Sequence, residues 1–166
     1  MQNLAESQGD DPKRELLRHV VATLAYRGGK VLRNAPSGFA EFRGGEGLRT
    51  PGEILAHLGD LLDWAHSITV GQQKYQVSPA LAWDEGAQRF FAALKQLDDL
   101  LASNQALQAP VEKLFQGPLA DALTHIGQLA ILRRLAGSAV KGESYYVAEI
   151  AVGRVGADQA APKREF

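Results

Sequence analysis

The stretch that decides the fold is residues 50–67, TPGEILAHLGDLLDWAHS. Thr50 followed three positions later by Glu53 is the pattern of a capping box, in which each side chain accepts a hydrogen bond from the other residue's backbone N–H. Pro51 suits the first helical position, where its missing N–H would have had no partner. Beyond this start, apolar residues recur at the spacing of one helix face, namely Ile54, Leu58, Leu61, Leu62, Ala65 and Ile68. The pattern therefore predicts an amphipathic helix from Thr50 to about Gly71.

Similar periodicity predicts three further long helices, over about residues 11–33, 83–107 and 119–136. Gly28 and Gly29 weaken the first of them near its end, and Gly137 is well placed to cap the last one. Long loops at 34–49 and 72–82 and a short connector at 110–118 join the helices. We therefore expect an all-α four-helix bundle with long inter-helix loops, without assuming simple up-down-up-down order.

The domain organisation follows from the same pass along the chain. A single bundle domain covers residues 11–152 and includes a short helix at about 145–151. Residues 1–10 are expected to be a frayed polar tail, and residues 153–166 a polar C-terminal tail.

Composition supports this fold class and excludes several function classes. The 166 residues include 25 Ala and 22 Leu against 10 Val, 5 Ile and 4 Thr, which favours helices over sheet. A net charge of -1 gives no basic excess for a nucleic-acid partner. The chain has no cysteine, no secretory leader pattern and no apolar run long enough for a membrane helix. We therefore expect a cytoplasmic protein that binds neither nucleic acid nor membrane.

Helix phase separates the four histidines by the side that they face. His19 lies away from the apolar stripe of its helix and is expected in solvent. His57 lies within the stripe of residues 50–67 and is expected to face the bundle. His66 lies half a turn out of phase with His57, so the two should not share a ligand.

The last long helix carries the fourth histidine in a polar stripe. Asp121, His125 and Gln128 follow one another at helical spacing, and Arg133 and Arg134 project from roughly the other side. The stripe is therefore expected to point into the bundle, where an uncompensated carboxylate would be costly.

Two interpretations of this arrangement remain open. His57 and His125 can be satisfied core histidines, with Asp121 paired to one of them. Alternatively, the three side chains converge from facing helices to bind a metal, as bundles commonly do.

Both helices also resemble a known family. Residues 50–67, with a His early in an amphipathic helix, resemble the second helix of the DinB-like metal-binding four-helix bundles. Residues 122–137, ALTHIGQLAILRRLAG, resemble that family's last bundle helix, in which a His precedes x-Gly-Gln and a Leu/Arg-rich run leads to Gly. The resemblance spans about residues 10–152, and the family name implies no DNA binding.

The resemblance implies a metal site. In that family one His on the second helix and a His-x-x-x-His pair on the fourth usually hold a divalent metal. By position His57 matches the first ligand and His125 the last, while Asp121 stands where the family has the middle His. The implied set of two His and one Asp suits Zn, Ni, Fe or Mn. Characterised relatives include thiol-dependent transferases, so the resemblance implies this chemistry, or small-molecule hydrolysis, in a metal-dependent enzyme.

Other side chains are weaker candidates for orienting the ligands or lining a pocket. Glu53 lies one turn before His57, and Gln128 is placed either to orient His125 or to make a core hydrogen bond. Trp64 and Glu149 are candidates for lining a cavity, together with the adjacent tyrosines at 145 and 146. The alternative to an enzyme is a non-catalytic binding or assembly module whose polar stripe is a structural network.

A homodimer is also expected. Leu119, Leu123, Ile126 and Ala130 give the last helix a second apolar face, which needs cover. A second copy of the chain or a folded-back C-terminal segment would supply it, and relatives in the resembled family are often dimers.

Overall fold

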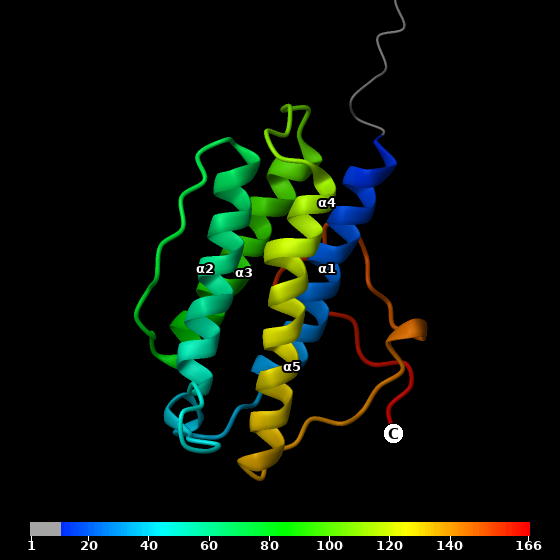
Figure 1. Cartoon of the computed structure of the whole chain (residues 1–166). Coiled ribbons are helices and arrows are strands. Elements are labelled where there is room, and N and C mark those ends of the chain that lie inside the picture. Colours follow the sequence, from blue (N-terminus) through cyan, green and yellow to red (C-terminus); the bar gives the residue numbers. More distant parts are fainter. Residues whose placement is uncertain (1–10) are drawn as a thin grey trace, which may run out of the picture.

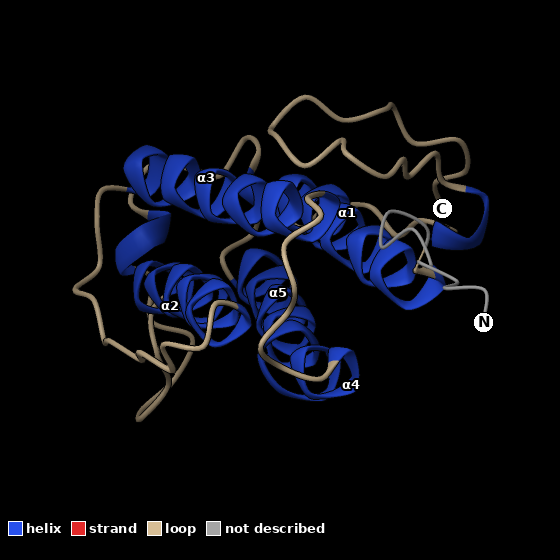
Figure 2. Cartoon of the chain, turned by 90° about the horizontal axis from the view of Figure 1, so that it is seen from above, coloured by secondary structure: helices blue, strands red, loops and turns tan. Residues whose placement is uncertain are grey.

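The computed structural model describes residues 11–166, and in this part of the chain all regular secondary structure is helical (Figures 1 and 2). The predicted tail at 1–10 lies outside the described residues. The four long helices are α1 (Pro12–Leu32), α2 (Pro51–Thr69), α3 (Trp83–Ala102) and α5 (Ala120–Leu135). The shorter elements are η2 (Phe39–Glu41), α4 (Val111–Leu114), η3 (Phe115–Leu119) and η4 (Tyr145–Val147). The expectation of an all-α bundle is confirmed.

The four long helices pack as a bundle in which α2 lies beside α3 and α5, and α1 also lies beside α3 and α5 (Figure 2). Helices α2 and α3 run in the same direction, because the chain between them returns along the whole length of α2 (Figure 1). Helices α1 and α5 run the opposite way. The order is therefore not up-down-up-down. Helices α2 and α5 lie side by side and run antiparallel.

Local capping signals are realised at the predicted positions. The Thr50 hydroxyl accepts from the Glu53 N–H at 3.3 Å, and the Glu53 carboxylate accepts from the Thr50 N–H at 2.7 Å. At the same end of the bundle, where α5 ends, Gly137 has φ +74°, and the N–H groups of Gly137 and Ser138 donate to carbonyls of the last turn of α5. This Schellman arrangement ends the helix.

The Gly28–Gly29 pair does not end α1, which continues to Leu32. A Cβ added at Gly28 would lie 2.6 Å from the Phe90 ring. The missing side chain therefore lets α3 approach α1, and the buried Phe90 ring fills the space.

Two helix boundaries differ from the prediction. Helix α3 ends at Ala102 rather than near residue 107, and the buried Arg14 guanidinium donates to the freed carbonyls of its last turn and the chain beyond it. The predicted 145–151 helix is only the single turn η4.

The predicted connector at 110–118 is also different, because it is helical. Helix α4 begins after Pro110 and runs into η3, where non-helical angles at Gly117 (φ −92°, ψ −105°) kink the chain before α5. Pro118 lacks the N–H that a regular α-helix would use, and the kink directly before it accommodates this loss. Leu114 and Leu119 are both buried although five residues apart, a spacing that would separate them by about 140° on a regular α-helix.

The segment after α5 packs along α1, on the side away from α2 (Figure 1). The Glu143 carboxylate is buried between the Tyr26 hydroxyl and the Lys30 ammonium group, which donates at 2.6 Å. Lys30 also pairs with Glu165 at 3.1 Å, and Val155 is buried in the core. Residues 153–166 are thus held against the bundle by a buried charge network and one apolar anchor.

None of the described helices is both long enough and apolar enough to cross a membrane.

Candidate metal centre

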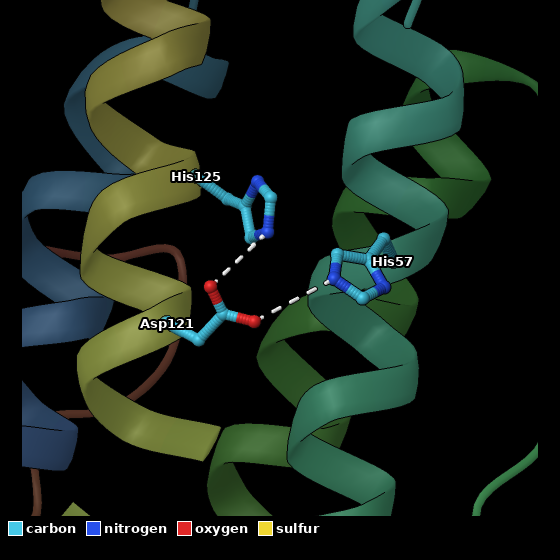
Figure 3. A group of neighbouring side chains, drawn as sticks. All are labelled: His57, Asp121 and His125. Atoms are coloured by element: carbon cyan, nitrogen blue, oxygen red, sulfur yellow. Dashed lines mark ion pairs between the residues drawn. The ribbon is translucent and has the colours of Figure 1, made fainter. Parts of the chain in front are cut away.

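Three side chains with metal-ligating atoms meet where α2 and α5 run side by side (Figure 3). His57 projects from α2, one turn after Glu53 of the capping box. Asp121 and His125 project from α5, four residues apart and therefore on one face of that helix. The structure brings together all three residues that the sequence singled out as ligands.

The ligand atoms converge on one point. The Nε2 atom of His125 lies 3.4 Å from one carboxylate oxygen of Asp121, and the Nε2 atom of His57 lies 3.7 Å from the other. All three residues offer ligand atoms within 4.8 Å of one another. Two ligand atoms at about 2.1 Å from one ion are about 3.4 Å apart at the tetrahedral angle. The Asp121 contacts of 3.4 and 3.7 Å are close to this spacing, so the three side chains lie within reach of a common divalent transition metal.

The outer nitrogen of each imidazole has its own partner. The Nδ1 atom of His125 lies 2.8 Å from Oε1 of Gln128, and the Nδ1 atom of His57 lies 3.2 Å from the hydroxyl of Tyr75. An amide oxygen only accepts hydrogen bonds, so Nδ1 of His125 carries the proton and Nε2 keeps its lone pair. Outer partners of this kind hold ligating histidines in the orientation that a metal needs.

Tyr75 is the residue at this site that the sequence did not suggest. It lies in the connection between α2 and α3, and its ring packs edge-on against Trp64 at 5.7 Å between centroids. The path of this loop along α2 brings Tyr75 to His57, and no local pattern in the sequence fixes that path. Trp64, predicted to line a cavity, thus supports the partner of a candidate ligand.

The sequence predicts that the polar stripe of α5, Asp121, His125 and Gln128, points into the bundle, but its carboxylate is not buried. The Asp121 side chain is 48% exposed, against 18% for His57 and 12% for His125. The core face of α5 is formed by Ala122, Ile126, Leu129 and Leu132 together with the side chain of Arg133. Apolar contact with the bundle sets the rotation of α5, so the stripe lies at its flank toward α2.

Electrostatics around His57 favour its neutral, metal-binding form. Burial lowers the pKa of His57, and the neighbouring His125 and Arg49 lower it further against the opposing effects of Asp121 and Asp60. A neutral imidazole has the free lone pair that ligation requires, so less proton competition is expected at neutral pH.

The imidazoles border an open cavity of about 510 Å³, which we call the α2–α5 cavity. It is lined by Gly47, Leu48, Arg49, Ile54, His57, His125, Gln128, Ile131, Leu132 and Leu135. A second hollow of about 440 Å³ lies on the other side of His57, beside Tyr75. The three candidate ligands therefore have open space beside them.

Of the remaining residues that the sequence singled out, only Glu53 lies beside this centre. The Glu53 carboxylate is engaged in the capping box and lines the second hollow. Glu149 belongs to the C-terminal segment and pairs with Arg154 and Lys163. His66 lines a different, polar hollow, and His19 is exposed as expected.

The two tyrosines at 145 and 146 also lie outside the centre. The Tyr145 ring packs edge-on against Tyr26 on α1, and Tyr146 is fully exposed. Neither ring lines the α2–α5 cavity.

Comparisons of the chain with protein-family models, with curated proteins and with solved structures give no match.

Proposed function

We propose that this protein is a metal-dependent enzyme of the DinB-like four-helix-bundle family, with His57, Asp121 and His125 as ligands of a divalent transition metal. The observation that carries the proposal is the convergence of two Nε2 atoms and a carboxylate on one point beside an open cavity. The fit of Zn, Ni, Fe and Mn to this donor set supports it further.

The chemistry that we propose is thiol-dependent group transfer or hydrolysis of a small molecule. A divalent metal held at this point supplies a Lewis acid that lowers the pKa of a coordinated water or thiol. The protein's own contribution is positional, because Gln128 and Tyr75 hold the outer imidazole nitrogens. The cavity walls admit a small substrate next to the ligands.

Metal analysis of the purified full chain tests the proposal. We expect about one transition-metal ion per chain after reconstitution, and anomalous scattering from that ion between α2 and α5. A matched His19→Ala variant keeps the metal, since His19 is exposed on α1. Failure to bind any transition metal after reconstitution would overturn the proposal.

One observation favours a second candidate function, a non-catalytic binding or assembly module. Asp121 lies within ion-pair distance of both imidazoles, so the three side chains can also form a structural polar network. In that case Asp121→Asn lowers the free energy of unfolding, because it removes the charged partner of both imidazoles, and adding metal does not raise the melting temperature. A metal-dependent rise in melting temperature excludes this candidate.

We also propose that the protein forms a homodimer, on the strength of the family resemblance. Of the face that the sequence suggested as needing cover, Leu119 and Ile126 are buried within the bundle, whereas Leu123 and Ala130 are half-buried against its core. The bundle itself therefore supplies most of the cover, and a dimer would use mainly other surfaces. Sedimentation equilibrium at micromolar concentration tests the dimer, and a monomer mass of 17.9 kDa would rule it out.

A further inference from the structure

The α2–α5 cavity has two chemically different surfaces. One is apolar, with Ile131 62% exposed, Leu135 57% exposed and Leu48 52% exposed at its rim. Large apolar side chains grouped in solvent around a hollow are typical of ligand-binding surfaces. The other surface is polar and carries the imidazoles of His57 and His125.

The glycine-rich loop before α2 forms one wall of the cavity. A Cβ added at Gly44 would lie 2.6 Å from a methyl group of Leu132, so the loop backbone approaches α5 closely. Gly47 has φ +73°, a conformation that a residue with a side chain rarely adopts. The turn at Gly47 places the next two residues, Leu48 and Arg49, on the cavity wall.

Arg49 supplies a positive charge to this wall of the cavity. It lines both the α2–α5 cavity and the second hollow, and its positive charge acts on His57. No carboxylate within residues 11–166 forms an ion pair with its guanidinium group. An unpaired guanidinium at the edge of an apolar cavity is suited to bind a carboxylate through two parallel hydrogen bonds.

We propose that the α2–α5 cavity binds an aliphatic carboxylate of medium chain length, with its carboxylate on Arg49 and its apolar chain against Leu48, Ile131 and Leu135. The inference rests on the proposed function, because the same cavity would present this ligand to the metal. Its volume of about 510 Å³ lies within the range of small-molecule sites.

Isothermal titration of the metal-loaded full chain with three probes tests the inference. Octanoate has the charge and the chain, 1-octanol has only the chain, and acetate has only the charge. We expect octanoate to bind with one site per chain and the other two probes at least about tenfold more weakly, since each loses one of the two contacts.

Three variants identify the contacts. Arg49→Gln should weaken octanoate binding about tenfold and leave 1-octanol binding unchanged. Arg43→Gln is the matched control, because Arg43 is an exposed residue of the same loop that lines neither hollow. Ile131→Gln should weaken octanoate but not acetate, and its exposure makes misfolding no concern.

The outcomes separate this inference from the proposed function, provided that the metal content of each sample is measured first. Stoichiometric metal with equal octanoate affinity in the wild type and Arg49→Gln overturns the inference alone. Arg49-dependent octanoate binding in a chain that takes up no metal overturns the proposed function and leaves the carboxylate site standing. Failure of both measurements overturns both.

Discussion

The amide oxygen of Gln128 lies 2.8 Å from Nδ1 of His125, the residue that precedes it by one turn on α5. Of the two roles that the sequence left open for Gln128, a core hydrogen bond or the orientation of His125, this contact favours the second. It fixes the imidazole tautomer, so that Nε2 faces Asp121 with its lone pair free.

Gln128→Leu should weaken zinc binding by about tenfold or more, because His125 loses the acceptor that holds its tautomer and ring orientation. Competition with a chromophoric chelator measures the affinity. Gln88→Leu, an exposed glutamine on α3, serves as the control. Unchanged zinc affinity in Gln128→Leu would show that this hydrogen bond does not prepare the ligand.

His125→Ala should abolish metal binding and leave the helical content largely intact. The bundle core is built mainly of Leu and Ala side chains, so folding does not depend on the metal as it does in a zinc finger. Metal analysis and far-ultraviolet circular dichroism measure the two properties on one sample. A variant that keeps full metal occupancy would move the site elsewhere, with His66 the next candidate.

Arg133→Met should lower the free energy of unfolding by about 3 kcal/mol, because it leaves buried carbonyls without donors. The Arg133 side chain is 4% exposed, and its five N–H groups donate to oxygens of Val31, Arg33, Asn34 and Ser138.

Urea denaturation measures this loss. Arg134→Met, at the exposed neighbouring position, should change stability by no more than about 0.5 kcal/mol. Equal effects at the two positions would contradict the role assigned to Arg133 in joining the ends of α1 and α5.

Asp60 should make stability fall as the solution becomes acidic. Burial acts to raise the pKa of Asp60, but hydrogen bonds from Ser78 and Arg89 outweigh it and hold the pKa below the ordinary 3.8. A folded-state pKa below the unfolded one contributes stability above pH 3.8, and this is lost as pH falls through the folded value.

Denaturation of the wild type and Asp60→Asn between neutral and strongly acidic pH measures this contribution. The variant should be less stable at neutral pH, and the difference should shrink below pH 3.8. Asp63→Asn, which removes a half-exposed partner of the same Arg89, should cost less. A difference that stays constant down to the lowest pH would contradict the assignment.

The features predicted from sequence are those set by local chemistry. The capping box at Thr50, the helix end at Gly137 and the phases of His57 and His125 depend on neighbours within a few residues of each. Helix spacing alone could therefore indicate that these histidines come together from two helices.

The features that sequence could not predict depend on distant parts of the chain. Arg133 is buried because carbonyls at the end of α1 accept its hydrogen bonds, and nothing near residue 133 indicates this. Likewise, Tyr75 reaches His57 only because the loop after α2 returns along the helix.

The kink at Gly117 within η3 has a consequence for how this chain can vary in length. One residue more or less in a regular helix rotates everything after it by about 100°. Because the kink separates α4 from α5, each helix buries its own apolar side, with Leu114 before the kink and Ile126 after it. Deleting one of residues 115–119 would shift the two helices out of phase, so that either Leu114 leaves the core or α5 turns Asp121 and His125 away from His57. Insertions and deletions in this turn should be tolerated far less than substitutions at its exposed positions.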